Sequence, residues 1–151
     1  MKKLLLPVFL FSCLFCLAQP STQMGIVNAA NNDSAWIVNN YYKIEKMIPM
    51  RDGIKLFTSI YIPKDSSEKH PIMMLRTPYS CAPYGENKFK PFWERNTKVY
   101  LKEKYIVVVQ DVRGRYMSEG VYEDIRPFIK DKKTKKDVDE ASDTYDAVEW
   151  I

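Results

Sequence analysis

Histidine, cysteine and glycine are all scarce in this sequence. His70 is the only histidine among 151 residues, and it lies in a Glu-Lys-His-Pro turn. No group of histidine, cysteine and carboxylate residues has the spacing of metal ligands. The five glycines form no phosphate-binding loop, and no Walker-type lysine follows one. The sequence therefore predicts neither a metal site nor an organic cofactor.

An apolar run long enough to span a bilayer is also missing. The main apolar run, Leu4–Leu17, follows the basic pair Lys2-Lys3 and leads to Ala18. Cys16 and Ala18 are small residues at the two positions that a signal peptidase reads. This pattern predicts a cleavable signal peptide over residues 1–18 and an exported protein, either periplasmic or secreted.

Few cysteines remain once the leader is removed. The first two of the three leave with it, so Cys81 stays alone and no internal disulfide forms. A lipoprotein would use Cys13 as its lipidated residue, but Phe11 and Ser12 before it fit that alternative poorly. Cys81 would need a base beside it to act as a nucleophile, and nothing in the sequence pairs it with His70. We expect a buried or loop cysteine.

Charge of one sign is not in strong excess. The formal net charge is +4, which becomes about +2 when Lys2 and Lys3 of the leader are subtracted. This value is too small to imply a nucleic-acid partner or a membrane partner beyond export. The run Lys130–Asp137 mixes lysine with aspartate and lacks interleaved aromatic residues, which favours a solvated loop over a patch for an anionic ligand.

Two short apolar runs, Ile72–Leu75 and Ile106–Val109, show no alternation of apolar and polar residues. Such runs are typical of strands that are buried on both faces of a sheet. The segment Phe89–Lys104 between them is long enough for a crossover helix. A strand, a helix and a strand of these lengths favour a parallel pair with a right-handed connection.

The stretch before these runs predicts a hairpin. Lys46–Met50 is expected to be a strand, which Pro49 confines to the edge of a sheet. Asp52-Gly53 then supplies the positive φ that a tight turn requires. Ile54–Ile62 alternates between its two sides, which predicts a half-buried strand antiparallel to the first.

The two ends of the mature chain are less regular. Residues 19–45 are expected to form an arm that is flexible at first. Its last part, Trp36–Glu45, fits a short helix or a strand, and a helical or irregular segment is favoured. Val138–Ile151 has an acidic first turn and predicts a second crossover helix. One face of that helix carries Ala141, Tyr145, Val148 and Ile151.

The order strand, strand, strand, helix, strand, helix predicts the opening half of an α/β fold over residues 46–151. A sheet that stops there would leave Ile106–Val109 at an apolar edge, and such an edge invites aggregation.

Polar residues follow both apolar runs. Arg76-Thr77-Pro78-Tyr79 follows the first, and Asp111-Val112-Arg113-Gly114 follows the second. In open parallel sheets functional residues gather just past the carboxyl ends of the strands. Each residue also has a structural explanation: Tyr79 as a packed aromatic, and Asp111 and Arg113 as partners of each other or of backbone groups. The residues alone leave these alternatives open.

Several motifs together resemble the amino-terminal part of one enzyme family. That family contains cocaine esterase, α-amino acid ester hydrolases, glutaryl-cephalosporin acylases and bacterial Xaa-Pro dipeptidyl peptidases, and the resemblance covers about residues 44 to 151. The most specific piece is the block Asp-x-Arg-Gly-x-x-x-Ser-x-Gly. The motifs are, in order, Met50-Arg51-Asp52-Gly53-Ile54-Lys55-Leu56, Arg76-Thr77-Pro78-Tyr79, the stretch 110–120, the stretch 139–146 and Glu149-Trp150-Ile151.

The resemblance implies an α/β-hydrolase fold, with a serine nucleophile on a strand-to-helix elbow and its aspartate and histidine partners later in the chain. It implies that Tyr79 donates to the oxyanion of the tetrahedral intermediate, and that Asp111 and Arg113 support the floor of the site. It also implies an ester, amide or short-peptide substrate and no cofactor. The elbow is expected shortly after Ile151, so these 151 residues are expected to lack the triad and to be inactive alone.

The sequence therefore fits two classes of function. One is the amino-terminal fragment of an exported serine hydrolase. The other is an exported binding or structural module without catalysis, which would fit a gene that stops at Ile151. Nucleic-acid binding through the lysines of residues 130–136 is disfavoured by the charge balance.

Overall fold

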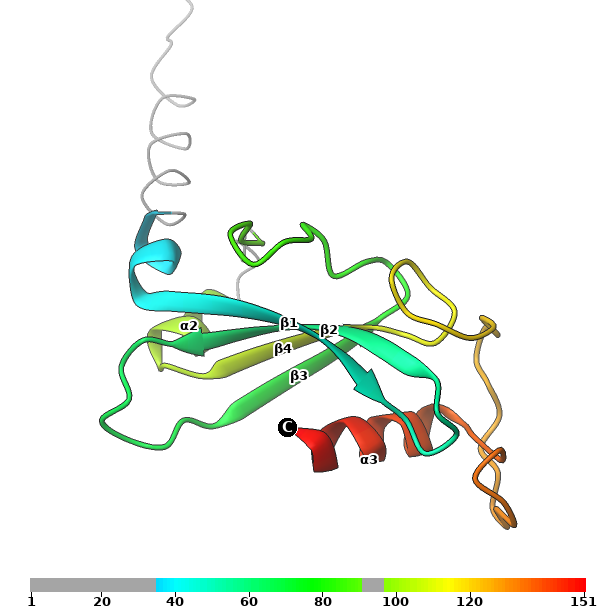
Figure 1. The fold of residues 1–151 in the computed structure, drawn as a ribbon. Helices are drawn as coiled ribbons and strands as arrows, with labels where there is room; N and C mark the ends of the chain where they lie inside the picture. Colours follow the sequence, from blue (N-terminus) through cyan, green and yellow to red (C-terminus); the bar gives the residue numbers. More distant parts are fainter. Residues whose placement is uncertain (1–34, 91–96) are drawn as a thin grey trace, which may run out of the picture.

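The structure, a computed structural model, describes residues 35–90 and 97–151. The predicted signal peptide and most of the predicted arm lie outside these residues, as does part of the predicted crossover helix. Residues 35–40 are helical and lead into the first strand. The elements that follow are β1 (Tyr41–Pro49), β2 (Lys55–Pro63), β3 (Ile72–Thr77), α2 (Thr97–Lys102), β4 (Ile106–Asp111) and α3 (Glu140–Trp150) (Figure 1).

The strands form one mixed sheet in the order β1-β2-β4-β3. β2 is antiparallel to both β1 and β4, whereas β3 and β4 are parallel. Helix α3 lies on one side of the sheet, and the loop after β3 and residues 35–40 lie on the other (Figure 1). The predicted α/β class and the predicted parallel pair are therefore confirmed.

The hairpin between β1 and β2 forms around the predicted turn. Gly53 has φ +88°, a value that side chains other than glycine rarely adopt. β1, however, begins at Tyr41 and not at Lys46, so the sheet extends into the stretch expected to be an arm. The extra length is held by Tyr41, whose buried hydroxyl donates to the carbonyl oxygens of Leu101 at 2.8 Å and Tyr105 at 3.0 Å.

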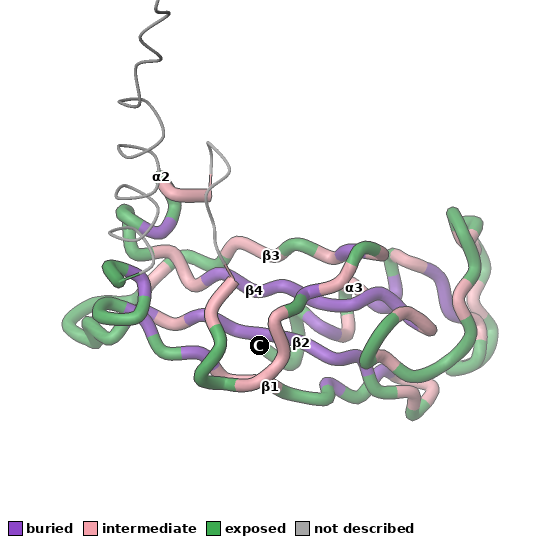
Figure 2. Tube along the Cα trace, turned by 90° about the horizontal axis from the view of Figure 1, so that it is seen from above, coloured by how far each residue is buried: buried purple, intermediate pink, exposed green. Residues whose placement is uncertain are grey.

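β2 is buried on both faces, and the prediction of a half-buried strand was wrong. Every residue from Leu56 to Tyr61 is buried. Figure 2 shows buried residues running along β2 and β4 in the middle of the sheet. Successive residues of β2 point to opposite faces of the sheet, and each face packs into a core of its own instead of one face being exposed to solvent.

The two cores use opposite faces of the sheet. The smaller one, on the α3 side, joins Ile48, Met50 and Leu56 to Ala147. The larger one packs the sheet against residues 35–40, the loop after β3, and α2. Its members are Ile37, Tyr41, Phe57, Tyr61, Cys81, Leu101, Val107 and Val109, with Tyr84 and Phe89 packed against them.

β3 and β4 have different surroundings although their sequences look alike. β4 lies between β2 and β3 and is buried, so the prediction that Ile106–Val109 forms an exposed edge was wrong. The reason is that β2 pairs with β4 on the side away from β3. Within the described part of the chain β3 is one of the two edge strands, with β1 at the opposite edge, and its residues Ile72 and Leu75 are 49% and 53% exposed.

Helix α3 presents its polar face to the sheet, contrary to the expectation from its apolar residues. Its buried residues are Ser142, Asp143 and Ala147. Tyr145 and Val148, on the face expected to pack, are more than half exposed. Asp139 caps the helix: its side chain accepts the N–H of Ser142 at 2.8 Å, and the Ser142 hydroxyl accepts the N–H of Asp139 at 2.8 Å.

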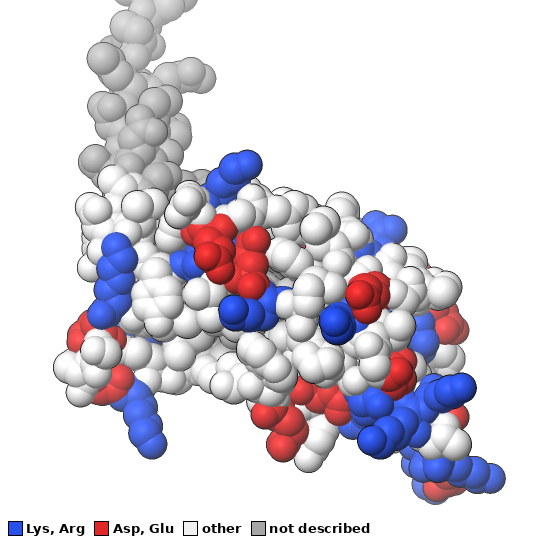
Figure 3. Space-filling model, in the orientation of Figure 1, with Lys and Arg blue, Asp and Glu red and all other residues white. Residues whose placement is uncertain are grey.

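The charged stretch 130–137 is a mostly exposed loop, as expected. Basic side chains gather over this segment at the lower right of Figure 3. The Asp137 carboxylate accepts the backbone N–H groups of Lys133 and Thr134 at 2.8 and 2.7 Å, which folds the loop back on itself. No helix in the described ranges is long and apolar enough to cross a membrane.

A lysine at the outer strand should reduce self-association of residues 19–151. We expect the wild-type polypeptide to form oligomers through β3, because its backbone edge is unpaired and its side chains are apolar. Leu75→Lys adds a charge to that strand and should shift the elution volume in size-exclusion chromatography toward the monomer. Ser67→Lys, in the exposed loop before β3, serves as the control. A monomeric, cooperatively melting wild-type product would contradict this expectation.

Candidate active site

The predicted site residues come together where β3 and β4 end. Thr77 is paired with Asp111, so the two parallel strands stop at the same level of the sheet. Tyr79 follows β3 by two residues, and Arg113 follows β4 by two. Because the carboxyl ends of parallel strands form the usual functional edge, this juxtaposition matches the one expected from the sequence.

Tyr79 lies on a turn that is tied to the structure while its side chain is free. Its backbone N–H donates to the hydroxyl oxygen of Thr77 at 3.0 Å, and Arg115 donates to the carbonyl of Pro78 at 3.1 Å. The residue is 83% exposed, and no hydrogen bond of its hydroxyl is found within the part of the chain described. Tyr79 is therefore not a packed aromatic, which was the structural alternative.

Asp111 is a buried carboxylate that joins the two loops at this edge. Its oxygens accept the N–H of Cys81 at 2.7 Å, the hydroxyl of Tyr84 at 3.0 Å and, more weakly, the N–H of Met117 at 3.4 Å. The first two donors follow β3 and the third follows β4. Burial, followed by the neighbouring Asp111 carboxylate, raises the pKa of Tyr84 to about 12. Tyr84 therefore stays protonated and remains a donor to Asp111.

Arg113 does not pair with Asp111, although such a pair was one structural alternative. Its guanidinium binds Asp143 of α3 at 2.6 Å and 3.0 Å, and Asp52 of the hairpin turn at 2.7 Å and 3.2 Å. Burial alone would lower the pKa of Arg113, but the two carboxylates keep it above its usual value. Arg113 therefore fastens α3 and the hairpin to the end of β4.

Other positions of the Asp-x-Arg-Gly block also have structural roles. The Ser118 hydroxyl donates to the carbonyl of Asp111 at 2.6 Å and accepts the N–H of Phe57 at 2.8 Å, which ties this loop to β4 and β2. Gly114 has φ +70°, and a Cβ there would collide with the backbone of Tyr122. The block thus specifies the shape of the loop after β4.

Sequence reasoning missed several residues that organise this edge. Arg76 donates to Gln110 at 2.9 Å, to the Glu140 carboxylate at 2.7 Å and to the Thr144 hydroxyl at 2.9 Å. Its position inside the Arg-Thr-Pro-Tyr motif was the available signal. Lys43 was missed because its stretch was not predicted to be a strand, so nothing in the sequence indicated that its side chain faces the core.

Cys81 is buried, which agrees with the expectation of a buried or loop cysteine. Burial, followed by the charge of Asp111, raises the pKa of its thiol to about 12. His70 precedes β3, whereas Cys81 follows it, so the two lie beyond opposite ends of that strand. Among residues 35–90 and 97–151, no group of histidine, cysteine and carboxylate side chains is arranged to hold a metal ion.

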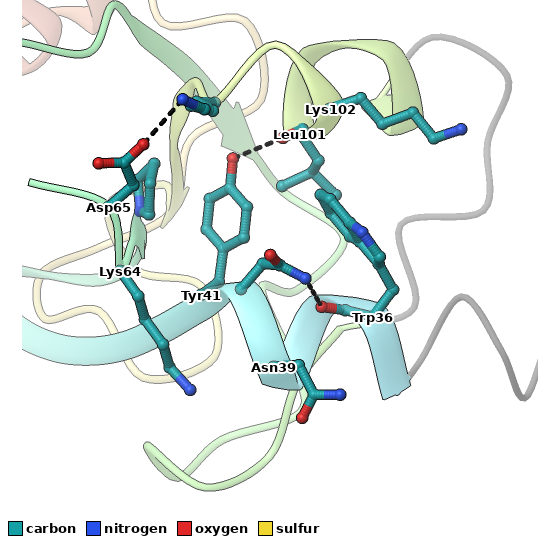
Figure 4. A pocket seen from close by; sticks show the side chains of 10 residues that line it. Trp36, Asn39, Tyr41, Lys64, Asp65, Leu101 and Lys102 are labelled. Carbon is teal, nitrogen blue, oxygen red and sulfur yellow. Dashed lines mark hydrogen bonds and ion pairs between the residues drawn. The ribbon is translucent and has the colours of Figure 1, made fainter. Parts of the chain in front are cut away.

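A cavity of about 210 Å³ lies at the other end of the sheet (Figure 4). It is lined by Trp36, Tyr41, Leu101 and several polar residues, including Lys64 and Asp65. Tyr41 points across it toward Leu101 in Figure 4. Its walls come from the beginning of β1, the end of β2, and α2, so it is separate from the edge that carries Tyr79.

The thiol of Cys81 should be protected in the folded protein. At pH 8 a thiol with a pKa of about 12 is almost entirely protonated, so reaction with Ellman's reagent should be at least about 10³-fold slower than in urea. Absorbance at the thionitrobenzoate band, recorded for residues 19–151 with and without denaturant, measures the ratio. Equal rates in both conditions would mean that the loop does not bury Cys81.

Removal of the carboxylate of Asp143 should destabilise the fold. Asp143→Ala leaves the buried Arg113 with only Asp52 as an ionic partner, and we expect a loss of about 3 kcal/mol in the free energy of unfolding. Urea denaturation followed by circular dichroism measures it. Glu149→Ala, an exposed change on the same helix, should alter stability by no more than about 0.5 kcal/mol. Equal effects of the two substitutions would contradict the role given to this ion pair.

Comparison with known proteins identifies the family. The sequence model of the X-Pro dipeptidyl-peptidase (S15) family matches residues 52–151. Cocaine esterase from Rhodococcus sp. (strain MB1 Bresler) is 33% identical over 109 residues, which cover 70% of this chain and 16% of the esterase.

Two solved structures support this relationship. A selenomethionine-labelled α-amino acid ester hydrolase is 40% identical, with a TM-score of 0.62 over 75% of this chain and 19% of that one. An aminopeptidase from the marine sediment archaeon Thaumarchaeota archaeon is 35% identical, with a TM-score of 0.56 over 74% of this chain and 18% of that one. The chain thus spans less than a fifth of the length of these relatives. It belongs to the X-Pro dipeptidyl-peptidase (S15) family of hydrolases.

Proposed function

We propose that this chain is the amino-terminal part of an exported serine hydrolase that transfers the acyl group of an ester or amide to water. The relatives are an esterase, an amino acid ester hydrolase and an aminopeptidase, so α-amino acid esters and short peptides such as Xaa-Pro peptides are the proposed substrate classes. Export is proposed on the leader at residues 1–18. The position of Tyr79 is the observation on which the catalytic proposal depends.

In this mechanism Tyr79 stabilises the negative charge of the tetrahedral intermediate. A serine oxygen attacks the substrate carbonyl carbon, the serine proton passes to the histidine of the triad, which later gives it to the leaving group, and the electron pair of the C=O bond moves to the oxygen. The Tyr79 hydroxyl donates a hydrogen bond to that oxygen. Collapse of the intermediate expels the alcohol or amine, which takes a proton, and water then releases the acyl group by the same route. A donor fixed before the charge develops is worth more than one that must be ordered during the reaction.

Three features of the structure support this role for Tyr79. The N–H and the C=O of the peptide group that joins Pro78 to Tyr79 are both hydrogen-bonded, to Thr77 and to Arg115, so the ring starts from a defined point. Its hydroxyl is available to an external acceptor, because the side chain is largely exposed. It lies at the carboxyl end of a strand that is parallel to its neighbour. Asp111, through the backbone N–H groups that it accepts, and Arg113, through its ion pairs, act as supporting residues and not as members of the triad.

Tyr79→Phe should lower turnover while the fold is retained. Removal of one oxyanion donor typically costs about 10² to 10³ in kcat, or roughly 3–4 kcal/mol. The measurement is steady-state hydrolysis of p-nitrophenyl acetate, and of a p-nitrophenyl ester of a small amino acid, by the full-length hydrolase that carries this chain. Tyr42→Phe, at an exposed position of β1, is the matched control and should keep wild-type turnover.

Unchanged turnover in Tyr79→Phe would remove Tyr79 from the mechanism. A separate test concerns the nucleophile, which we expect as a Gly-x-Ser-x-Gly elbow encoded within about 20 residues after Ile151. Sequencing of the coding region beyond that codon settles this point. A stop codon there would favour the alternative, an exported binding or structural module.

A further inference from the structure

Lys43 is a lysine whose side chain is completely buried. It lies on the same face of β1 as Tyr41, the face that carries the larger core. Its Nζ donates to the carbonyl oxygens of Pro83 at 2.6 Å, Lys88 at 3.1 Å and Gly85 at 3.2 Å. A lysine ammonium has three N–H donors, and three of the oxygens around this one are carbonyls of one short loop segment, residues 83–88.

Glu45 completes this arrangement from the next position on the same face of β1. Its Oε1 lies 2.6 Å from the Lys43 Nζ and accepts the N–H of Gly85 at 2.8 Å. The backbone N–H of Glu45 donates to the Glu86 carboxylate at 3.3 Å. We call Lys43 and Glu45 the β1 clasp, because together they bind residues 83–88 by both carbonyl and N–H groups.

Stability alone is a poor explanation for the β1 clasp. Burial of an ammonium and a carboxylate carries a desolvation cost that an apolar pair of similar volume would avoid, and such replacements are often neutral or stabilising. What the charged pair adds is a requirement on the orientation of the backbone groups that bind it. Three carbonyl dipoles converge on one cation only if the segment adopts a single conformation, so the clasp specifies the path of residues 83–88.

That path follows closely after the turn of Tyr79. Only Ser80, Cys81 and Ala82 separate Tyr79 from the clasped segment. Ser80 has φ +86°, a value that a serine keeps only where its surroundings hold it. Its hydroxyl lies 2.9 Å from the Tyr84 hydroxyl, which in turn donates to Asp111. The strained residue next to Tyr79 is thus linked through one side chain, Tyr84, both to Asp111 and to the segment that the β1 clasp binds.

We infer that Lys43 and Glu45 are positioning residues for the hydroxyl of Tyr79. The inference rests on the proposed function of Tyr79 as the oxyanion donor. The two residues touch no substrate: they act through the backbone of residues 80–88. Without the ammonium, the three carbonyls lose their common donor, Ser80 can relax, and the phenol leaves its position. A misplacement of about 1 Å typically costs on the order of 10² in rate.

A double-mutant cycle tests this in the full-length hydrolase that carries the chain. The four proteins are wild type, Lys43→Met, Tyr79→Phe and the double variant, each assayed for kcat and KM with p-nitrophenyl acetate. We expect Lys43→Met to lower kcat by about 10- to 10²-fold with KM within about twofold, because the loss concerns the transition state. In the Tyr79→Phe background the same change should lower kcat by less than about threefold, because the hydroxyl that it positions is already gone.

The cycle separates this inference from the function on which it rests. Equal losses from Lys43→Met in both backgrounds would show a general structural effect and would overturn the positioning role. An unchanged kcat in Lys43→Met would overturn it as well. If Tyr79→Phe alone keeps wild-type turnover, the proposed function itself fails and the inference fails with it.

Two further variants keep the test decisive. If Lys43→Met does not fold, as judged by circular dichroism and thermal melting, Glu45→Gln takes its place. This change keeps an acceptor for the N–H of Gly85 and removes the charge beside Lys43, so the same non-additivity with Tyr79→Phe is expected and additivity would overturn the inference. The matched control is Lys64→Met, an exposed lysine whose ammonium donates to the carbonyl of Val38 at 2.9 Å and to no residue of the segment 83–88 among the described contacts. It should leave kcat unchanged in both backgrounds.

Discussion

The contact between helix α3 and the sheet depends on ion pairs between buried or partly buried groups. Arg113 holds Asp143 of the helix and Asp52 of the hairpin turn, and Arg51 of the same turn binds Asp146 at 2.8 Å. Apolar contact is nondirectional and would allow a helix to rotate or slide, whereas paired guanidinium and carboxylate groups allow one register only. These pairs bring together the hairpin, the end of β4 and the start of α3, and so they define the edge at which the site lies.

The site is built mainly from hydrogen bonds between side chains and backbone groups. A side chain without the same donor or acceptor could not replace the one present. Asp111 collects donors from both loops, Ser118 joins β2 to β4, and the pair Lys43 and Glu45 fixes the segment that follows Tyr79. The phenol of Tyr79 is exposed, whereas Asp111, Arg113 and Ser118 of the same region have their side chains engaged. An arrangement that immobilises the backbone and leaves one hydroxyl available suits a reaction in which charge appears at a single atom.

Much of the fold followed from local patterns in the sequence. The apolar runs at Ile72 and Ile106 predicted a parallel pair, Asp52-Gly53 predicted the hairpin, and the motifs after each run predicted the edge that holds Tyr79, Asp111 and Arg113. Strand order did not follow, because the pairing of β2 with β4 joins residues far apart in the sequence. The packed face of α3 was also missed: periodicity marks apolar residues, and here the buried face is polar because the arginines that neutralise it come from other elements.

The polar contact of α3 makes the two sides of the sheet respond differently to acid. Burial favours the protonated form of Asp146, but the hydrogen bonds from Arg51 prevail and its pKa lies below the usual value. Burial likewise opposes the ionised form of the helix cap Asp139, and the Ile129 N–H and Lys132 still lower its pKa. Such groups stabilise the folded state above the pKa of a free carboxyl, near 4, and that contribution disappears as the pH falls through their lowered values. The apolar side chains of the larger core do not titrate in this range, so acid acts on the ion pairs of α3 and not on those apolar contacts.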